Sequence, residues 1–332
     1  MSVDLAEPTQ SFLSDDEIEG LDFSGLAPAR ALDDDSVDQE EGFWHAFDDE
    51  QLFWQSWEPR GGPSRGAVAL MHGFGEHSSR YDHVAGALCR AGYAVLAIDA
   101  RGHGKSTGKR AHVERYDHYV RDYDLLKLQT AARWPEVDLF CVGHSNGGLI
   151  ALRYALTRPD GVTGFVVTSP MCGLALEVPR LKEAAGKLMS KVWPSFTMPN
   201  DLDPSKLSHV QRVVDKYSKD PLDLKIVSAR WFTEAGQAQD DLWERASQLD
   251  QAFLFLLAGQ DEIVDTNAAE EIFHRMGSGD REMEVFPKLY HEILNEESWG
   301  AIVRRMIRWM ERHRRDEMAA DEMDQRDAEG SS

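Results

Sequence analysis

A serine residue stands at a sharp corner in the segment Gly143-His144-Ser145-Asn146-Gly147. An apolar run precedes this segment and a helix-like run follows it. A GxSxG turn between a strand and a helix pushes the serine hydroxyl out above a sheet. The flanking glycines let the strand and the helix approach each other closely, and the helix N-terminus aims its N–H groups and positive dipole end at an anion forming there. The pattern predicts that Ser145 is a catalytic nucleophile.

A serine hydroxyl is a poor nucleophile at neutral pH, so it needs a base and a group that orients the base. In such a sheet the acid and then the histidine follow the serine, in loops after later strands. Asp261 is the first acid after the apolar run 252–258, and His291 follows the run 282–286. We predict that Asp261 orients His291, the base. Asp265 is the rival acid, although its position favours the first turn of the next helix. Helix capping by Asp261 and a capping or surface role for His291 are the remaining alternatives.

The tetrahedral intermediate of acyl transfer needs backbone N–H donors, each of which contributes a factor of roughly 10²–10³. The residue after the nucleophile, Asn146, is one expected donor. The other is Phe74, since His72-Gly73-Phe74 follows directly after the apolar run 67–71 and Gly73 permits a close turn. The Phe74 side chain is then free to line an acyl pocket. We expect structural roles for His72 and His144, through hydrogen bonds to the loops.

Strands and helices alternate along the chain in the order that a sheet supporting this corner requires. Continuous apolar runs predict strands covered on both faces at residues 67–71, 94–98, 138–142, 164–168 and 252–258. Helical periodicity separates them at residues 81–91, 116–133, 147–157, 268–276 and 297–312. Such alternation predicts a parallel sheet with helices on both sides. Two aromatic-rich runs around Asp48-Asp49-Glu50 predict an antiparallel hairpin before the first parallel strand.

The interval from residue 169 to about residue 249 is mostly helical, rich in proline, and shows no strand pattern. It predicts a helical insertion above the sheet. Within it, apolar residues recur at helical spacing between residues 179 and 196, with basic residues interspersed: Arg180, Lys182, Lys187 and Lys191. We expect this amphipathic helix to be a lid whose apolar face covers an acyl tunnel. In the alternative interpretation, its basic residues also contact anionic lipid surfaces. Trp193, Phe196, Met198 and Trp231 either line the tunnel or hold the cap together.

Charge is concentrated at the two ends of the 332-residue chain, whose formal net charge is −22. The first 50 residues contain one basic residue, Arg30, among many acids, and the segment after Arg315 is similarly acidic. Acidic runs repel themselves and bury little apolar surface, so we expect residues 1–41 and 316–332 to be disordered tails. They serve either as solvating spacers or as docking arms. No basic stripe with interleaved aromatics indicates a nucleic-acid partner, and nothing in the sequence indicates a protein partner.

The three cysteines, Cys89, Cys141 and Cys172, lie far apart and form neither a disulfide framework nor a zinc-ligand pattern. The N-terminus lacks the basic and apolar regions of a signal peptide, and no apolar run approaches the roughly 18 residues that span a bilayer. We therefore expect a cytoplasmic protein without a metal site.

Several segments together carry a resemblance to a known family. "HGFGEHSSRYDHVAGAL", "IDARGHGKSTG", "GHSNGG", "SKDPL", "SARW", "AGQDEIVD" and "YHEILNE" resemble the monoacylglycerol lipase and lysophospholipase branch of the α/β-hydrolase superfamily, a group that also includes S33-type serine aminopeptidases. The resemblance covers roughly residues 43–312. Two departures stand out: Asn146 occupies a position that is methionine in most members, and Asp48-Asp49-Glu50 replaces a tight Asp-Gly turn. An amide beside the nucleophile weakens the case for a purely aliphatic acyl site.

The resemblance implies an α/β fold with a mostly parallel eight-stranded sheet, helices on both faces and a helical cap inserted at about 170–248 of a domain spanning 42–315. It implies Ser145 as nucleophile, Asp261 as acid, His291 as base, and Phe74 and Asn146 as oxyanion donors. Gly73, Phe74, Trp193 and Phe196 are the expected substrate contacts. The loop residues are expected to be scaffold: Asp99, Arg101, Gly102, His103, Gly104 and Ser106.

Three functional hypotheses follow. The favoured one is a serine carboxylester hydrolase that cleaves a single-chain lipid, a monoacylglycerol or a lysophospholipid, through an acyl-enzyme and without a cofactor. The second is a peptidase, amidase or acyltransferase that uses the same triad. The third is a non-catalytic binding protein on this fold, or an interaction protein acting through its acidic tails.

Overall fold

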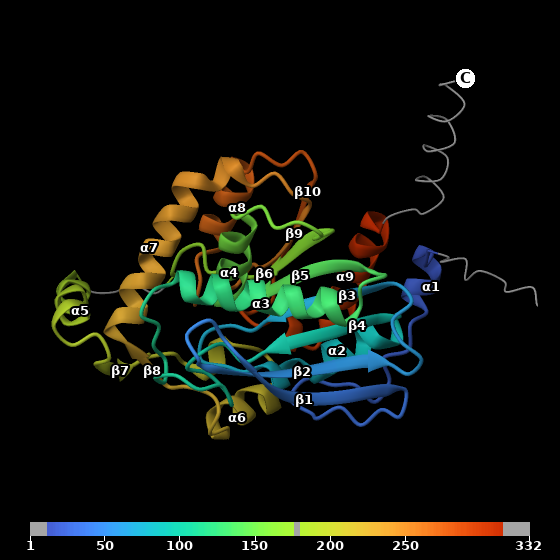
Figure 1. Ribbon diagram of the computed structural model, residues 1–332, viewed down its shortest axis with the longest axis horizontal. Helices are drawn as coiled ribbons and strands as arrows, with labels where there is room; N and C mark the ends of the chain where they lie inside the picture. The colour runs from blue at the N-terminus through green and yellow to red at the C-terminus, as the bar shows by residue number, and fades with distance from the viewer. Residues whose placement is uncertain (1–11, 176–179, 315–332) are drawn as a thin grey trace, which may run out of the picture.

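An eight-stranded sheet forms the centre of the protein, of which the computed structural model describes residues 12–175 and 180–314 (Figure 1). The strands are β1 (Val37–His45), β2 (Gln51–Pro59), β3 (Gly66–Met71), β4 (Tyr93–Ile98), β5 (Asp138–His144), β6 (Gly164–Thr168), β9 (Phe253–Ala258) and β10 (Arg281–Phe286). Their order in the sheet is β1-β2-β4-β3-β5-β6-β9-β10. β1 and β2 are antiparallel, as are β2 and β4, and the remaining pairs are parallel. The predicted hairpin and mostly parallel sheet are confirmed.

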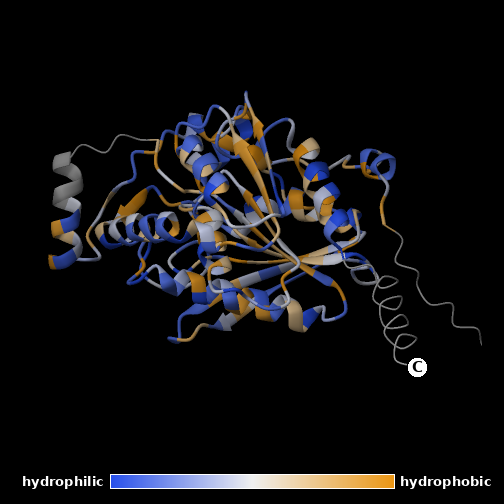
Figure 2. Ribbon diagram, turned by 90° about the horizontal axis from the view of Figure 1, so that it is seen from above, coloured by the Kyte–Doolittle hydropathy of each residue, from blue (hydrophilic) through white to orange (hydrophobic). Residues whose placement is uncertain are grey.

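Helices cover both faces of the sheet (Figure 1). One face carries α2 (Asp82–Arg90) and α9 (Trp299–His313), and the other carries α3 (Asp117–Arg133), α4 (Asn146–Ala155) and α8 (Thr266–Arg275). Because successive strand residues point to opposite faces, Val68 and Leu70 pack in the core below α2 and α9, whereas Ala69 and Met71 pack in the core below α3 and α4. Figure 2 shows these apolar strands enclosed between helices with hydrophilic outer sides. All five helices match the predicted ranges closely.

The N-terminal segment departs from its expected disorder. Residues 12–41 are placed against the domain and include the helix α1 (Asp15–Glu19) and the start of β1. Ile18 is 1% exposed, and Arg304 of α9 donates hydrogen bonds to the carbonyls of Ile18 and Leu21. The prediction of a disordered tail is therefore wrong for residues 12–41, because apolar residues spaced among the acids pack on α2 and α9. Residues 1–11 and the predicted tail 316–332 lie outside the described residues.

The cap lies between β6 and β9. It contains α5 (Arg180–Val192), β7 (Thr197–Pro199), the 3₁₀ turn η2 (Pro204–Lys206), α6 (Gln211–Lys219), β8 (Ile226–Ser228), α7 (Ala229–Arg245) and the turn η3 (Ala246–Gln248). The expectation of a strand-free cap is wrong, since β7 and β8 pair antiparallel with Met198 opposite Val227. Three-residue strands are too short to show a period-2 pattern. In Figure 1, α5 lies at the outer edge of the molecule, with α7 between it and the rest of the fold.

Candidate active site

Ser145 occupies the sharp turn between β5 and α4. Its backbone has φ 53° and ψ −117°, which is strained for a residue with a side chain. Neighbouring backbone leaves room only for glycine on both sides: a Cβ on Gly143 would lie 2.3 Å from the Gly147 carbonyl oxygen, and one on Gly147 would lie 2.3 Å from that of Met71. The Ser145 N–H donates to the Thr168 carbonyl at 3.0 Å, which anchors the turn to β6. The local sequence thus produces the predicted strained corner.

His291 and Asp261 form a short hydrogen bond, with 2.6 Å between Nδ1 and Oδ2. The other carboxylate oxygen of Asp261 accepts the N–H groups of Ile263 and Val264, each at 2.9 Å. Since the ionised carboxylate only accepts, Nδ1 carries a proton, and in the neutral imidazole Nε2 has the free lone pair. The rival acid, Asp265, instead caps α8 through the N–H of Asn267, as its position predicted.

The electrostatics of this pair favour the charged imidazolium. Burial lowers the pKa of His291, but Asp261 raises it more strongly, and the net shift is upward from the usual 6.5. Burial likewise raises the pKa of Asp261, but His291 and the backbone N–H donors outweigh burial and hold it below its usual value. A histidine in this setting is suited to accept a proton and to hold it beside the carboxylate.

Ser145 and His291 line the same cavity, of about 440 Å³, between the sheet and the cap. Most of its wall is apolar and comes from the cap, including Met198, Leu202, Val227, Trp231 and Phe232. Gly73 and Phe74 also line it, in agreement with their predicted substrate contacts. A largely apolar pocket with a few convergent polar groups is typical of a small-molecule site.

Trp193 and Phe196, the other two predicted substrate contacts, are absent from this cavity lining. Their rings contact each other, with centroids 5.5 Å apart, and Trp193 is 58% exposed. Both follow the end of α5 at Val192, and Phe196 is half-buried. The prediction that they bind substrate in the chamber is not supported.

The two predicted oxyanion donors flank the nucleophile. A Cβ on Gly73 would lie 3.1 Å from the Ser145 Cβ, so the loop before Phe74 passes directly beside the serine. Asn146 is the first residue of α4, and helix geometry leaves its N–H without an intrahelical acceptor. The Asn146 side chain is 1% exposed, accepts a hydrogen bond from the Tyr116 hydroxyl at 2.8 Å, and does not line the cavity. The amide therefore does not add a polar group to the cavity lining, although its position in the sequence had weakened the case for an aliphatic acyl site.

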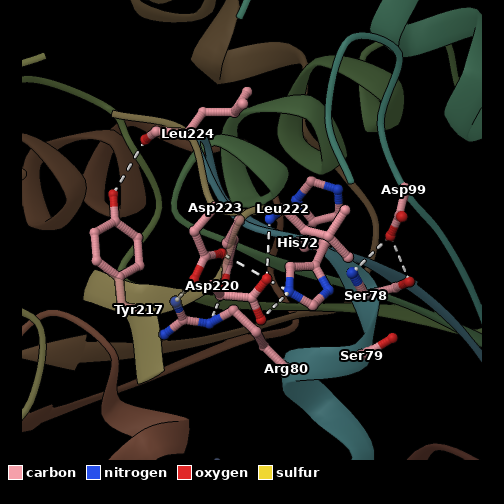
Figure 3. A network of polar contacts seen from close by, with 12 residues as sticks. His72, Ser78, Ser79, Arg80, Asp99, Tyr217, Asp220, Leu222, Asp223 and Leu224 are labelled. Atoms are coloured by element: carbon pink, nitrogen blue, oxygen red, sulfur yellow. Dashed lines mark hydrogen bonds and ion pairs between the residues drawn. The ribbon is translucent and has the colours of Figure 1, made fainter. Parts of the chain in front are cut away.

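His72 and His144, the two histidines next to the catalytic residues, have the structural roles that we expected. His72 accepts the Ala100 N–H at Nε2, at 2.8 Å, and contacts the Gly73 carbonyl through Nδ1. His144 Nδ1 lies 3.0 Å from the Thr168 hydroxyl, and burial lowers its pKa to about 4. Asp99 also has a structural role, since it accepts hydrogen bonds from Ser78 (Figure 3) and from the Lys105 N–H.

A buried ion cluster beside the cavity has no counterpart in the sequence predictions. Arg80 contacts Glu76, Asp223 and Glu292, and all four side chains are at most 6% exposed. Glu76 also accepts the Gly73 N–H at 2.5 Å and the Tyr81 hydroxyl at 2.8 Å. Burial raises the pKa of Glu76, but Arg80 and nearby histidines lower it to about 2. The i, i+4 spacing of Glu76 and Arg80 was the only local signal, since Asp223 and Glu292 come from distant segments.

This cluster connects the loop that carries Gly73, the loop that carries His291 and the cap. Glu76 holds the loop carrying Gly73 and Phe74, and Glu292 follows His291 directly. Asp223 belongs to the cap segment between α6 and β8. One buried guanidinium therefore links the glycine loop, the histidine loop and the cap.

Comparisons with known proteins agree with this geometry. Residues 62–298 match the family of S33 serine aminopeptidases. A monoacylglycerol lipase of Mycolicibacterium smegmatis is 31% identical over 267 residues, which are 79% of this chain and 94% of that protein. An uncharacterized abhydrolase domain-containing protein of Dictyostelium discoideum is 32% identical over 79% of this chain, which spans 28% of that longer protein. The crystal structure of Paleococcus ferrophilus monoacylglycerol lipase has a TM-score of 0.70 and 29% identity, and the match covers 83% of this chain and 99% of that one. Among the described residues, every helix is too short or too polar to cross a membrane.

Proposed function

This chain belongs to the S33 serine aminopeptidase family of α/β-hydrolases and is a monoacylglycerol lipase-like serine ester hydrolase, and we propose that its substrates are single-chain lipid esters. The observation that carries the proposal is the placement of Ser145 and of the Asp261-bound His291 on one largely apolar chamber. A chamber of about 440 Å³ suits one acyl chain. Monoacylglycerols and lysophospholipids share that chain and differ in the head group.

The proposed reaction uses the chain's own residues. His291 Nε2 accepts the Ser145 Oγ proton while Oγ attacks the ester carbonyl, and Asp261 holds the Nδ1 proton and stabilises the imidazolium. The N–H groups of Phe74 and Asn146 stabilise the oxyanion. The C–O bond to the alcohol then breaks, and His291 returns the proton to the leaving oxygen. Water attacks the acyl-serine by the same route, with His291 again the base, and releases the fatty acid and free Ser145.

A fluorophosphonate probe tests the nucleophile. We expect labelling of the wild type and none of Ser145→Ala, with turnover of the variant reduced by roughly 10⁴–10⁶. Folded wild-type protein that resists labelling would indicate the non-catalytic binding protein. A change in turnover below about tenfold would refute Ser145 as the nucleophile.

A substrate panel tests the lipid. Monoacylglycerols, lysophospholipids, nitrophenyl esters and aminoacyl amides of graded chain length are assayed with Ser145→Ala as control. We expect kcat/KM to rise with acyl length until the chamber is filled. A preference for amides, or for acyl transfer to a non-water acceptor, would favour the peptidase, amidase or acyltransferase hypothesis.

Peripheral contact between the cap and a lipid surface is a separate part of the proposal. Leu188, Val192 and Trp193 are 62%, 73% and 58% exposed on and after α5, and Lys187 and Lys191 are exposed beside them. An apolar face with flanking lysines is typical of helices that lie on anionic membranes. We expect Val192→Ser with Trp193→Ser to reduce flotation with anionic vesicles and activity on vesicle-borne substrate, while activity on a soluble nitrophenyl ester stays within about twofold. Equal losses on both substrates would argue against a surface role.

A further inference from the structure

A second group of chemically active side chains lies outside the chamber, where the cap meets the loop after β3. His77 Nε2 is 3.4 Å from Asp220 Oδ2 and 3.9 Å from Asp223 Oδ1. The three atoms all lie within 4.8 Å of one another. Figure 3 shows the two aspartates side by side near Arg80. None of the three residues lines the chamber, so the group is distinct from the proposed active site.

Two of the three converging atoms, His77 Nε2 and Asp223 Oδ1, are buried without a hydrogen bond in the described part of the chain. His77 is 3% exposed, and neither of its ring nitrogens makes a hydrogen bond within the described part of the chain. Asp223 Oδ1 is buried and likewise without a hydrogen bond there. Buried polar atoms without a hydrogen bond are rare in native proteins, and binding of an ion is one of the ordinary ways in which such atoms are satisfied.

The opposite oxygen of each aspartate is already held. Asp220 Oδ1 accepts the Leu222 N–H at 2.9 Å, and Asp223 Oδ2 faces Arg80 at 3.3 Å. Each carboxylate is therefore oriented by one oxygen and presents the other to His77. Metal-binding carboxylates are oriented by outer hydrogen bonds in this way.

We propose that His77, Asp220 and Asp223 bind one divalent cation of the zinc class. Imidazole nitrogen together with carboxylate oxygen suits zinc and its transition-metal neighbours, whereas magnesium and calcium prefer oxygen alone. Tetrahedral zinc with bonds of about 2.0–2.2 Å keeps its ligands about 3.4 Å apart. The distances from His77 Nε2 to the two carboxylate oxygens, 3.4 and 3.9 Å, need only a small contraction.

The surroundings also favour an additional positive charge. Four carboxylates surround His77 and Arg80: Glu76, Asp220, Asp223 and Glu292. Lys225 and Lys216 also interact electrostatically with Asp223 and Asp220, so the carboxylates exceed the arginine and lysine charges by one. Buried carboxylates in excess of their counter-charges are costly unless a cation or protons balance them. The Asp220 side chain is 16% exposed, so a cation would enter past this residue and could take water as its fourth ligand.

Binding here would fasten the cap to the hydrolase core. His77 belongs to the core loop that also carries Gly73, whereas Asp220 and Asp223 belong to the cap after α6. A cation shared by these segments holds them together without touching the substrate. The expected consequence is structural, because the cation stabilises the contact between the cap and the core and does not take part in ester cleavage.

Zinc binding by the untagged, chelator-treated full chain tests the site. We expect the protein to bind one equivalent of zinc, measured by titration calorimetry and by metal analysis after dialysis. Its melting temperature should be higher in zinc than in chelator. His77→Ala and Asp220→Asn remove direct ligands, so each should lower the affinity by more than the roughly 10–100-fold that loss of an outer partner costs. Asp220→Asn preserves shape, and fluorophosphonate labelling reports whether each variant is folded.

His209→Ala is the matched control. His209 also faces one carboxylate, with 2.8 Å between its Nδ1 and Glu296, but its side chain is 43% exposed, and among residues 12–175 and 180–314 it forms no ion pair with a second acid. We expect this variant to retain the equivalent of zinc. The proposal is overturned if the wild type fails to bind zinc at millimolar concentration, if His77→Ala binds as tightly as the wild type, or if His209→Ala loses the binding. Because bound metal is measured, Ser145→Ala protein gives the same answer, and failure here is separable from failure of the proposed hydrolase activity.

Discussion

Replacing Asp261 by asparagine should place the proton of His291 on the wrong nitrogen. The N–H groups of Ile263 and Val264 both donate to Asp261 Oδ1, so the amide oxygen of the variant must occupy that position. The amide NH₂ then faces His291 Nδ1, which has to become the acceptor. The imidazole proton moves to Nε2, and the nitrogen intended for the Ser145 proton is no longer free to accept it.

The expected loss in kcat is about 10⁴-fold, the size of effect that the same substitution has in another serine hydrolase triad, or about 5.4 kcal/mol in the activation free energy. KM should change little, since Asp261 does not line the chamber. Steady-state kinetics on a short nitrophenyl ester measures both constants. The control is Asp265→Asn, which lies four residues further on and caps α8. Asparagine caps helices as well as aspartate, so kcat should stay within about twofold.

The pH profile provides a second measurement on the same proteins. His291 acts as a base only when neutral, so wild-type kcat/KM should rise with pH through a pKa above 6.5, in the direction of the shift that Asp261 causes. Asp261→Asn removes that negative charge, and the acidic limb should move to lower pH. A folded Asp261→Asn protein that loses less than about tenfold in kcat, or whose acidic limb moves to higher pH, would refute the assignment.

Three further substitutions test the surroundings of the site. Arg80→Met leaves buried carboxylates without their counter-charge and should lower the free energy of unfolding by about 3–5 kcal/mol. The loss should be larger at pH 8 than at pH 5.5, because protons neutralise the acids at low pH. Denaturant titration measures it, with Arg60→Met as the control, since that variant breaks an exposed pair worth below about 1 kcal/mol. Glu76→Gln loosens the loop beside the nucleophile and should lower kcat by about 10- to 100-fold with little change in KM, measured by steady-state kinetics. Ile18→Ala should lower the free energy of unfolding by about 2 kcal/mol with unchanged kcat, whereas the exposed Asp16→Ala should change it by less than about 0.5 kcal/mol.

The sheet and the corner at Ser145 were predictable because their signals are local. Parallel strands appear as continuous apolar runs, and the glycines around Ser145 mark close approaches that only glycine allows. Asp261 and His291 were predictable because strand order fixes which loops meet at one edge of a parallel sheet. That order also distinguishes Asp261 from Asp265, whose carboxylate caps a helix.

The remaining features depend on contacts between distant segments. Arg80 and Glu292 are 212 residues apart, and Leu13 and Glu311 are 298 residues apart, so no window of sequence contains either pair. The acidity of residues 12–41 indicated disorder because composition averages over the segment, while its few apolar residues determine the packing. Similarly, Trp193 continues an apolar pattern without revealing which side of the cap that pattern faces.

The segment after β3 contacts the chamber at one end and the cap at the other. Gly73 lies beside Ser145, and Arg80, seven residues later, contacts Asp223 of the cap. Glu76 lies between them and contacts both Gly73 and Arg80. If the cap moved away, Asp223 would leave Arg80, and the guanidinium that holds Glu76 would lose one of its buried partners. Placement of the cap and placement of the loop beside Ser145 therefore stabilise each other through these buried contacts.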